Sequence, residues 1–182
     1  MTITHETIYG ASSVLVAAIA ATTDLRTRRI PNALTGPAIL FGLGLHLVLG
    51  GPASLGYAAL GGLIAGAIFL VFYLAGGMGA GDVKLMTAIG CILGLGGIRP
   101  AILAIVIAGG LCAIAMAIYK GALRNTLSNV GTLIAHHRTS GLTPHADLNV
   151  TNSRTIRLPY GLPIAAGCIV SFILATAKQA AQ

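Results

Sequence analysis

The most constraining feature of the sequence is a long stretch without charge. Between Arg29 and Asp82 there is no lysine, arginine, aspartate or glutamate, and apolar residues and glycine dominate. Over the whole chain only 8% of the residues are charged, and 55% are hydrophobic. A soluble domain carries about 25% charged residues. The composition therefore predicts an integral membrane protein with a single polytopic domain over residues 1–182.

Apolar windows of about 20 residues are long enough to cross a bilayer as a helix. Such windows predict an all-α bundle of about six transmembrane helices, over residues 8–23, 33–49, 55–75, 83–95, 101–119 and 158–177. Glycine-rich turns are expected at residues 50–52, 76–81 and 96–100. The pairs Gly62–Gly66 and Gly90–Gly94 have the spacing that lets helix backbones pack closely.

The basic residues predict which helix ends face the cytoplasm, because positive charge accumulates in cytoplasmic loops. They follow the first window, accompany the glycine loop and populate the loop before the last window: Arg26, Arg28, Arg29, Lys84, Lys120, Arg124, Arg138, Arg154 and Arg157. With six windows these segments share one face, so we expect both termini outside. The net charge of +7 then reflects topology, and nucleic-acid binding is not expected.

Acidic residues are few, namely Glu6, Asp24, Asp82 and Asp147. Asp24 closes the first window and Asp82 opens the fourth, so both are expected at the cytoplasmic membrane face. Ionisable groups at membrane depth are costly and usually functional. Two close carboxylates share a proton and can act as general acid and base. The alternative is structural: Asp24 pairs with Arg28 or Arg29, and Asp82 caps a helix.

Three short motifs accompany the aspartates. Ile30-Pro31-Asn32 follows Asp24 after the basic cluster, Gly79-Ala80-Gly81-Asp82-Val83-Lys84 opens the fourth window, and Leu158-Pro159-Tyr160-Gly161 opens the last. In this order they resemble the type IV prepilin peptidase family, membrane aspartic proteases with a Gly-x-Gly-Asp motif. The resemblance extends over essentially the whole chain, and the short form is similar to the peptidases of tight-adherence (Flp) pilus systems.

The resemblance implies a Gly-x-Gly-Asp protease bundle with Asp24 and Asp82 as the catalytic pair and without metal or cofactor. The substrate would be a pilin precursor, cut at the cytoplasmic face of the bacterial inner membrane. Substrate contacts are expected from residues of the three motifs: Pro31, Asn32, Gly79, Gly81, Lys84, Pro159 and Gly161. Asn32 can instead cap the second helix, and Lys84 can tune Asp82, bind a substrate carboxylate or mark the cytoplasmic side.

Larger members of that family carry paired Cys-x-x-Cys motifs in a cytoplasmic insert and an N-methyltransferase activity. No Cys-x-x-Cys occurs in this chain, and only residues 30–35 connect the first basic cluster to the second window, so methylation is not expected. The alternative functions are a small channel or transporter, with the aspartates along a pore, and a non-catalytic pilus assembly subunit.

The loop at residues 120–157 lies in an unusual place for the family. An apolar stripe recurs there at helical spacing, formed by Leu123, Leu127, Val130 and Ile134. We therefore expect an amphipathic helix in the membrane interface, followed by an irregular stretch at residues 140–153. The histidines His136, His137 and His145 fit no strong ligand spacing, so no metal site is predicted.

Overall fold

The computed structural model describes residues 4–143, 148 and 159–180, and the regular elements in these residues are all α-helices. They are α1 (His5–Thr27), α2 (Asn32–Leu74), α3 (Ala80–Tyr119), α4 (Leu123–Ser140) and α5 (Gly161–Ala180). Four of these helices, α1, α2, α3 and α5, are long and apolar enough to cross a membrane. The predicted all-α membrane class is confirmed, whereas the count of six spans is not.

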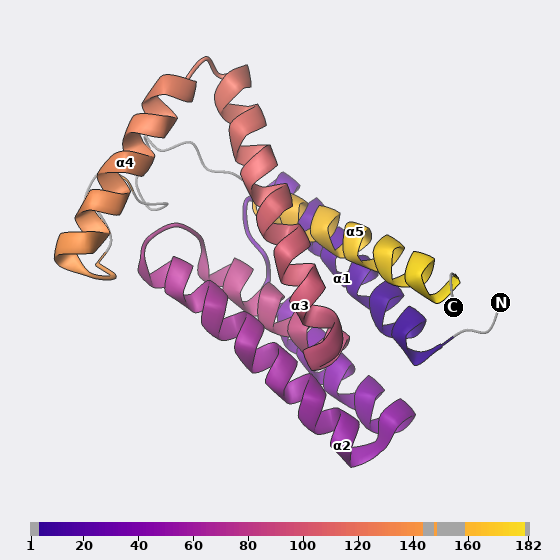
Figure 1. Cartoon of the computed structure of the whole chain (residues 1–182). Helices are drawn as coiled ribbons and strands as arrows, with labels where there is room; N and C mark the ends of the chain where they lie inside the picture. The colour runs from indigo at the N-terminus through magenta and orange to yellow at the C-terminus, as the bar shows by residue number, and fades with distance from the viewer. Residues whose placement is uncertain (1–3, 144–147, 149–158, 181–182) are drawn as a thin grey trace.

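The difference in count comes from α2 and α3, which each contain an interior break (Figure 1). Gly51 (φ 72°, ψ −171°) and Gly94 (φ 64°, ψ −179°) have positive φ, which glycine adopts without steric cost. At each break the helix folds back, so α2 and α3 each consist of two apolar segments. The turn expected at residues 96–100 is helical, and the chain reverses at Gly94 instead.

A buried histidine, His46, is hydrogen-bonded to a residue next to each of the two breaks. His46 is 4% exposed, and its ring stacks on Tyr9 with centroids 3.9 Å apart. Its Nε2 lies 3.0 Å from the carbonyl oxygen of Ile92, just before the break in α3, and its Nδ1 lies 2.8 Å from Ser54 Oγ, just after the break in α2. Because a carbonyl only accepts, Nε2 carries a proton, and the Ser54 hydroxyl donates to Nδ1 when the ring is neutral.

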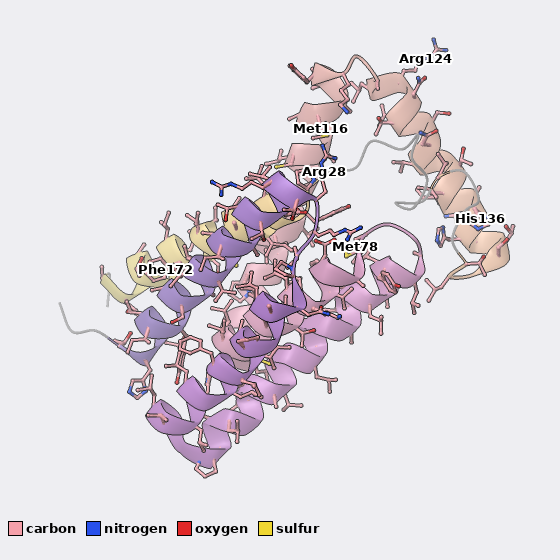
Figure 2. All side chains as sticks on the ribbon, turned by 180° about the vertical axis from the view of Figure 1, so that it is seen from behind. Arg28, Met78, Met116, Arg124, His136 and Phe172 are labelled. Atoms are coloured by element: carbon pink, nitrogen blue, oxygen red, sulfur yellow. The ribbon has the colours of Figure 1, made fainter. Side chains whose placement is uncertain are left out.

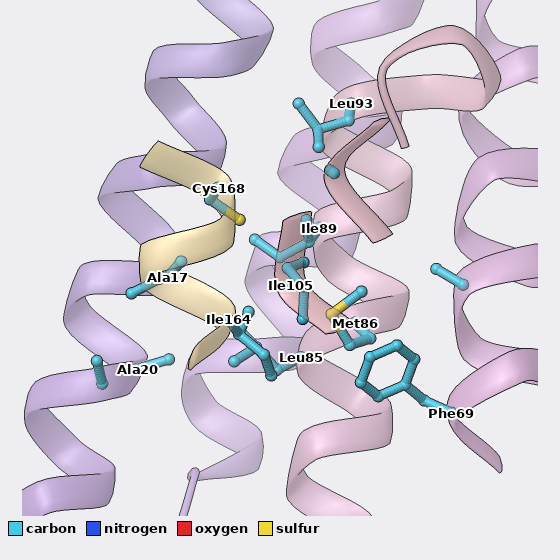
Figure 3. Packing of buried hydrophobic residues seen from close by; sticks show 14 of the residues in the cluster. Ala17, Ala20, Phe69, Leu85, Met86, Ile89, Leu93, Ile105, Ile164 and Cys168 are labelled. Atoms are coloured by element: carbon cyan, nitrogen blue, oxygen red, sulfur yellow. The ribbon is translucent and has the colours of Figure 1, made fainter. Parts of the chain in front are cut away.

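The apolar core lies between α1, α5, the two segments of α3 and the second segment of α2, which contributes Ala65 and Phe69 (Figure 3). Small side chains on α1, such as Ala17 and Ala20, let α5 approach closely, while Leu85 and Ile89 of α3 fill the centre. Large apolar side chains elsewhere point outward, as Leu40, Val48, Leu63, Leu103, Leu111 and Leu174 do. An exterior of this kind suits lipid, which agrees with the membrane class.

Glycines bring the second segment of α2 against the first segment of α3. A Cβ added at Gly62 would meet Cys91 Sγ, and one at Gly66 would lie 2.5 Å from Thr87 Oγ1. At Gly90 it would collide with the carbonyl oxygen of Gly61. Both predicted glycine pairs, Gly62–Gly66 and Gly90–Gly94, therefore belong to close helix–helix contacts.

Replacing Gly90 with alanine is expected to destabilise the bundle by about 2–3 kcal/mol, because the new methyl group overpacks a rigid contact. The Cβ would lie 2.7 Å from the carbonyl carbon of Gly61 and 2.8 Å from Gly62 Cα, and backbone atoms cannot move aside as a flexible side chain can. The measurement is the thermal unfolding midpoint in detergent or lipid. Gly110→Ala is the matched control, since its Cβ meets nothing within 4 Å. Equal midpoints for both variants would contradict this packing.

The start of α1 and the two aspartates lie at opposite ends of the bundle. The start of α1 and the end of α5 lie together, where the Thr4 hydroxyl donates to Gln179 Oε1 over 3.3 Å (Figure 1). These two helices are therefore antiparallel. At the opposite end α1 finishes, α5 begins and α3 begins, and both aspartates lie there.

Candidate active site

Two buried carboxyl groups lie at the end of the bundle opposite to the chain termini. Asp24 is in the last turns of α1 and is 8% exposed, and Asp82 is in the first turn of α3 and is 9% exposed. They come from different helices, yet they are close enough for an electrostatic interaction between them. The structure thus brings the two aspartates to the same end of the bundle, as the topology from the sequence required.

Asp24 is held by the first residue of the last helix. The backbone N–H of Gly161 donates to Asp24 Oδ2 over 2.9 Å, and the bond is buried. The first N–H groups of a helix have no partner inside the helix, so they readily bind an anion. Arg28 and Arg29 have exposed side chains, whereas the Asp24 carboxyl faces inward against α5. The alternative in which Asp24 pairs with Arg28 or Arg29 stays open beside this buried contact.

Asp82 is held by its own helix start. Gly79 is the N-cap of α3, and its backbone N–H donates to Asp82 Oδ2 over 3.0 Å. The capping role expected from the sequence is therefore real, although Asp82 occupies the third helical position and not the cap itself. The helix also begins at Ala80, earlier than the window at residues 83–95 indicated.

Each of the two carboxyl groups is anchored through only one of its oxygens. Both N–H bonds go to Oδ2, and among the described residues neither Oδ1 atom has a hydrogen-bond partner. A carboxyl group fixed through one oxygen keeps its orientation while the other oxygen accepts or donates a proton. This arrangement suits general acid–base chemistry.

The glycines before Asp82 are explained by contacts within the protein. A Cβ at Gly81 would lie 3.2 Å from the Cβ of Ile30 and 3.4 Å from its carbonyl oxygen. A Cβ at Gly79 would lie 3.4 Å from Asp82 Oδ2. Glycine at these positions lets the start of α3 pack on the connection that follows α1. Substrate binding by Gly79 and Gly81 stays a prediction.

The connection between α1 and α2 also contacts α3 through a polar bond. The ammonium group of Lys84 donates to Asn32 Oδ1 over 2.8 Å, at an exposed position. Of the two roles considered for Asn32, the cap of α2 is not adopted, because Pro31 is the N-cap residue and no side chain caps that helix. The side chain of Asn32, which is the first residue of α2, turns toward Lys84 instead.

Tyr160 is the site residue that sequence reasoning left without a role. It is half-buried, directly precedes Gly161, and packs against the apolar core. Burial raises the pKa of the Tyr160 phenol, and the negative charge of Asp82 raises it further. Pro159 and Tyr160 form the entry turn of α5, because their carbonyl oxygens accept from Leu162 and Ile164. The entry turn thus relates to both aspartates, since Gly161 bonds to Asp24 and the charge of Asp82 acts on Tyr160. The place of Tyr160 beside Gly161 in the third motif was the available signal.

Other polar clusters do not join this site. Among the described residues there is no group of three or more histidine, cysteine, aspartate or glutamate side chains that could hold a metal ion. His136 and His137 lie on α4, with ring centroids 5.4 Å apart. His145, Arg154, Arg157, Leu158 and most of the stretch at residues 140–153 lie outside the described residues.

Comparison with known proteins gives a family. No curated protein and no solved structure matches the chain. The model of the type IV leader peptidase family matches residues 11–118, which include both aspartates and run from α1 almost to the end of α3. The third motif lies beyond the match, yet the hydrogen bond from Gly161 to Asp24 joins it to the matched region. Because the match covers more than half of the sequence, the chain belongs to the type IV leader peptidase family.

Proposed function

We propose that the protein is an aspartic endopeptidase that removes the leader from type IV pilin-like precursors of the Flp kind. The observation that carries the proposal is the pair of buried carboxyl groups, Asp24 and Asp82, each fixed by one backbone N–H. Membership in the peptidase family indicates peptide-bond hydrolysis, and the two carboxyl groups can serve as its general acid and base. No other acidic side chain among the described residues lies at this end of the bundle.

The proposed mechanism uses one aspartate as carboxylate and the other as carboxylic acid, which is the state that two close carboxyl groups prefer. The carboxylate accepts a proton from water while the water oxygen bonds to the scissile carbonyl carbon. The acid donates its proton to the carbonyl oxygen. When the tetrahedral intermediate collapses, the carbon–nitrogen bond breaks and the aspartate that took the water proton gives it to the leaving amine. The other aspartate takes back a proton from a hydroxyl of the intermediate, so both aspartates return to their starting states.

Charge supports a cytoplasmic location for this chemistry. Arg26, Arg28 and Arg29 surround the end of α1, and Lys84 follows Asp82. Positive charge of this kind accumulates on the cytoplasmic side of bacterial inner membranes. The proposed enzyme therefore cuts at the cytoplasmic face and has both termini outside.

The substrate must present an extended segment, because the peptide bonds of a helix are already hydrogen-bonded and poorly exposed. The resemblance to prepilin peptidases implies a short basic leader, a glycine before the cut and a hydrophobic segment after it. Gly161 bonds to Asp24, Pro159 belongs to the same entry turn of α5, and Pro31 follows Ile30, which packs on Gly81 next to Asp82. We therefore assign Pro31, Pro159 and Gly161 to the wall that such a segment meets. The short connection between α1 and α2, without Cys-x-x-Cys, supports a peptidase without N-methyltransferase activity.

The alternatives make different demands on the aspartates. A channel or transporter needs ionisable groups along a pore, near the middle of the membrane. Carboxyl groups at helix ends, each bonded to a backbone N–H, suit a catalytic pair better. A non-catalytic assembly subunit would not need the pair at all. The deciding test is cleavage of a precursor in membranes by variants that lack either carboxyl group.

The Lys84–Asn32 bond gives a second test of how the site is built. If Lys84 acts by fixing the start of α3, Lys84→Met and Asn32→Ala should each lower the cleavage rate by about fivefold, the scale of one exposed charged contact. The double variant should be no worse than either single variant, because both remove the same bond. Asn32→Asp keeps an acceptor and should retain activity. A much larger loss for Lys84→Met alone would show that the ammonium group meets the substrate instead.

A further inference from the structure

Helix α4 presents an apolar stripe that nothing in the described structure covers. None of its residues is buried, and four large apolar side chains lie along one side: Leu123, Leu127, Val130 and Ile134. Leu127 is 64% exposed and Ile134 is 53% exposed. Figure 2 shows α4 standing apart from the bundle, with Arg124 near its beginning and His136 near its end. A surface of this kind needs a partner.

The position of α4 identifies that partner. Helix α3 can cross a membrane and ends at Tyr119, and α4 begins at Leu123 after a turn at Gly121 (φ 62°). Tyr119 is 90% exposed and Lys120 follows it, and tyrosine and lysine are typical of the membrane–water boundary. Asp82 lies in the first turn of α3, and the helix folds back at Gly94. The end of α3 therefore returns to the membrane face that carries the aspartates, and α4 begins at that face.

The charge of α4 matches an anionic lipid surface. The helix has no acidic residue, and it carries Arg124 and Arg138, with Lys120 just before it. Arg124 and Arg138 are fourteen positions apart, about four turns, so they lie on the same side of the helix. At 100° per residue that side borders the apolar stripe, whereas Asn125, Asn129 and Thr132 lie opposite. Arginines that border an apolar stripe reach lipid phosphates while the stripe enters the acyl region.

We propose that α4 binds the surface of the bilayer that holds the bundle, with its apolar stripe in the acyl boundary and Arg124 and Arg138 on the phosphates of anionic phospholipids. The sequence predicted an interfacial helix, and the proposal adds the lipid class, the side that enters and the residues that bind. In this position α4 holds the end of α3 at a fixed depth in the membrane. Because Asp82 lies in the first turn of the same helix, α4 thereby also sets the depth of the aspartates relative to the headgroups.

The chain contains no tryptophan, so one introduced tryptophan reports on a single position. The full chain carrying Leu127→Trp is reconstituted into vesicles of phosphatidylcholine mixed with phosphatidylglycerol, with or without bromine on the acyl chains. We expect blue-shifted emission and strong quenching by the brominated lipid. Thr132→Trp is the matched control on the opposite side of α4 and should show red-shifted emission with several-fold weaker quenching. Equal quenching at both positions would overturn the proposed orientation.

A second arm tests the lipid class. In the Leu127→Trp background, quenching should be stronger with phosphatidylglycerol than with phosphatidylcholine alone, and Arg124→Gln with Arg138→Gln should remove that difference. Quenching that changes neither with the lipid headgroup nor with the two arginine replacements would overturn the anionic-lipid assignment. Blue-shifted emission without quenching would show that a protein surface covers the stripe, and the proposal would fail. No step uses proteolysis, so the outcome is independent of the proposed enzymatic function.

Discussion

Replacing Asp24 or Asp82 with asparagine is expected to abolish precursor cleavage, with a fall of about a thousandfold or more, the scale of general acid–base catalysis. Asparagine keeps a side-chain oxygen that can accept from Gly161 or Gly79, so each anchor survives while the acid–base group is lost. The double variant should be about as inactive as either single variant, because residues that act as a unit are not additive. The measurement is the conversion of a pilin-like precursor to its shorter product in membranes.

Glu6→Gln is the matched control for these variants. Glu6 is an acidic residue in the first turn of α1, at the end of the bundle away from the candidate site. Its replacement removes a carboxylate of the same protein without touching the pair, and cleavage should be unchanged. Expression and thermal midpoint of all variants should match the parent protein. Cleavage that persists in either Asp24→Asn or Asp82→Asn would refute the pair as the catalytic group.

Gly161→Ala is expected to lower cleavage by about ten- to a hundredfold, because misplacing a catalytic group by less than an ångström is costly. The added Cβ would lie 3.0 Å from the Cα of Ala21, 3.1 Å from the Cβ of Asp24 and 3.2 Å from its Oδ2. The start of α5 or the side chain of Asp24 must therefore shift by a few tenths of an ångström. Alanine is the better helix former, so the expected loss cannot come from helix propensity.

The control for Gly161→Ala is Gly44→Ala, whose Cβ meets nothing within 4 Å. The rate of precursor cleavage and the thermal midpoint are measured on the same preparations. The expected result is an enzyme that stays folded and cuts slowly, while the control keeps its full rate. Full activity in Gly161→Ala would mean that the position of Asp24 does not depend on the entry turn of α5.

The all-α class and the shared face of Asp24 and Asp82 were predictable, because both follow from the order of the apolar windows along the sequence. Apolar windows without charge allow only membrane helices. Asp24 ends the first window and Asp82 begins the fourth, and in a chain that crosses the membrane back and forth these two positions share one face. The hydrogen bond between Asp24 and Gly161 was not predictable in the same way. It joins residues 137 positions apart, and no periodicity of the sequence encodes a contact of that kind.

The reversal of α3 shows a second limit. The Gly96-Gly97 pair and Pro100 gave a strong local turn signal, yet those residues are helical and the chain turns at Gly94. A Cβ at Gly94 would lie 2.9 Å from the Cε1 atom of His46, a residue of a different helix. Packing between helices therefore decided which glycine took the positive φ. Local turn propensity alone does not contain that information.

The bond between Asp24 and Gly161 has a consequence for the order of synthesis. It joins α1 to α5, and α5 is synthesised after both aspartates have left the ribosome. A nascent chain that ends before residue 159 already carries both aspartates, but Asp24 has no N–H to hold it. Under the proposed function, proteolysis therefore begins only once α5 has been made and has inserted beside α1.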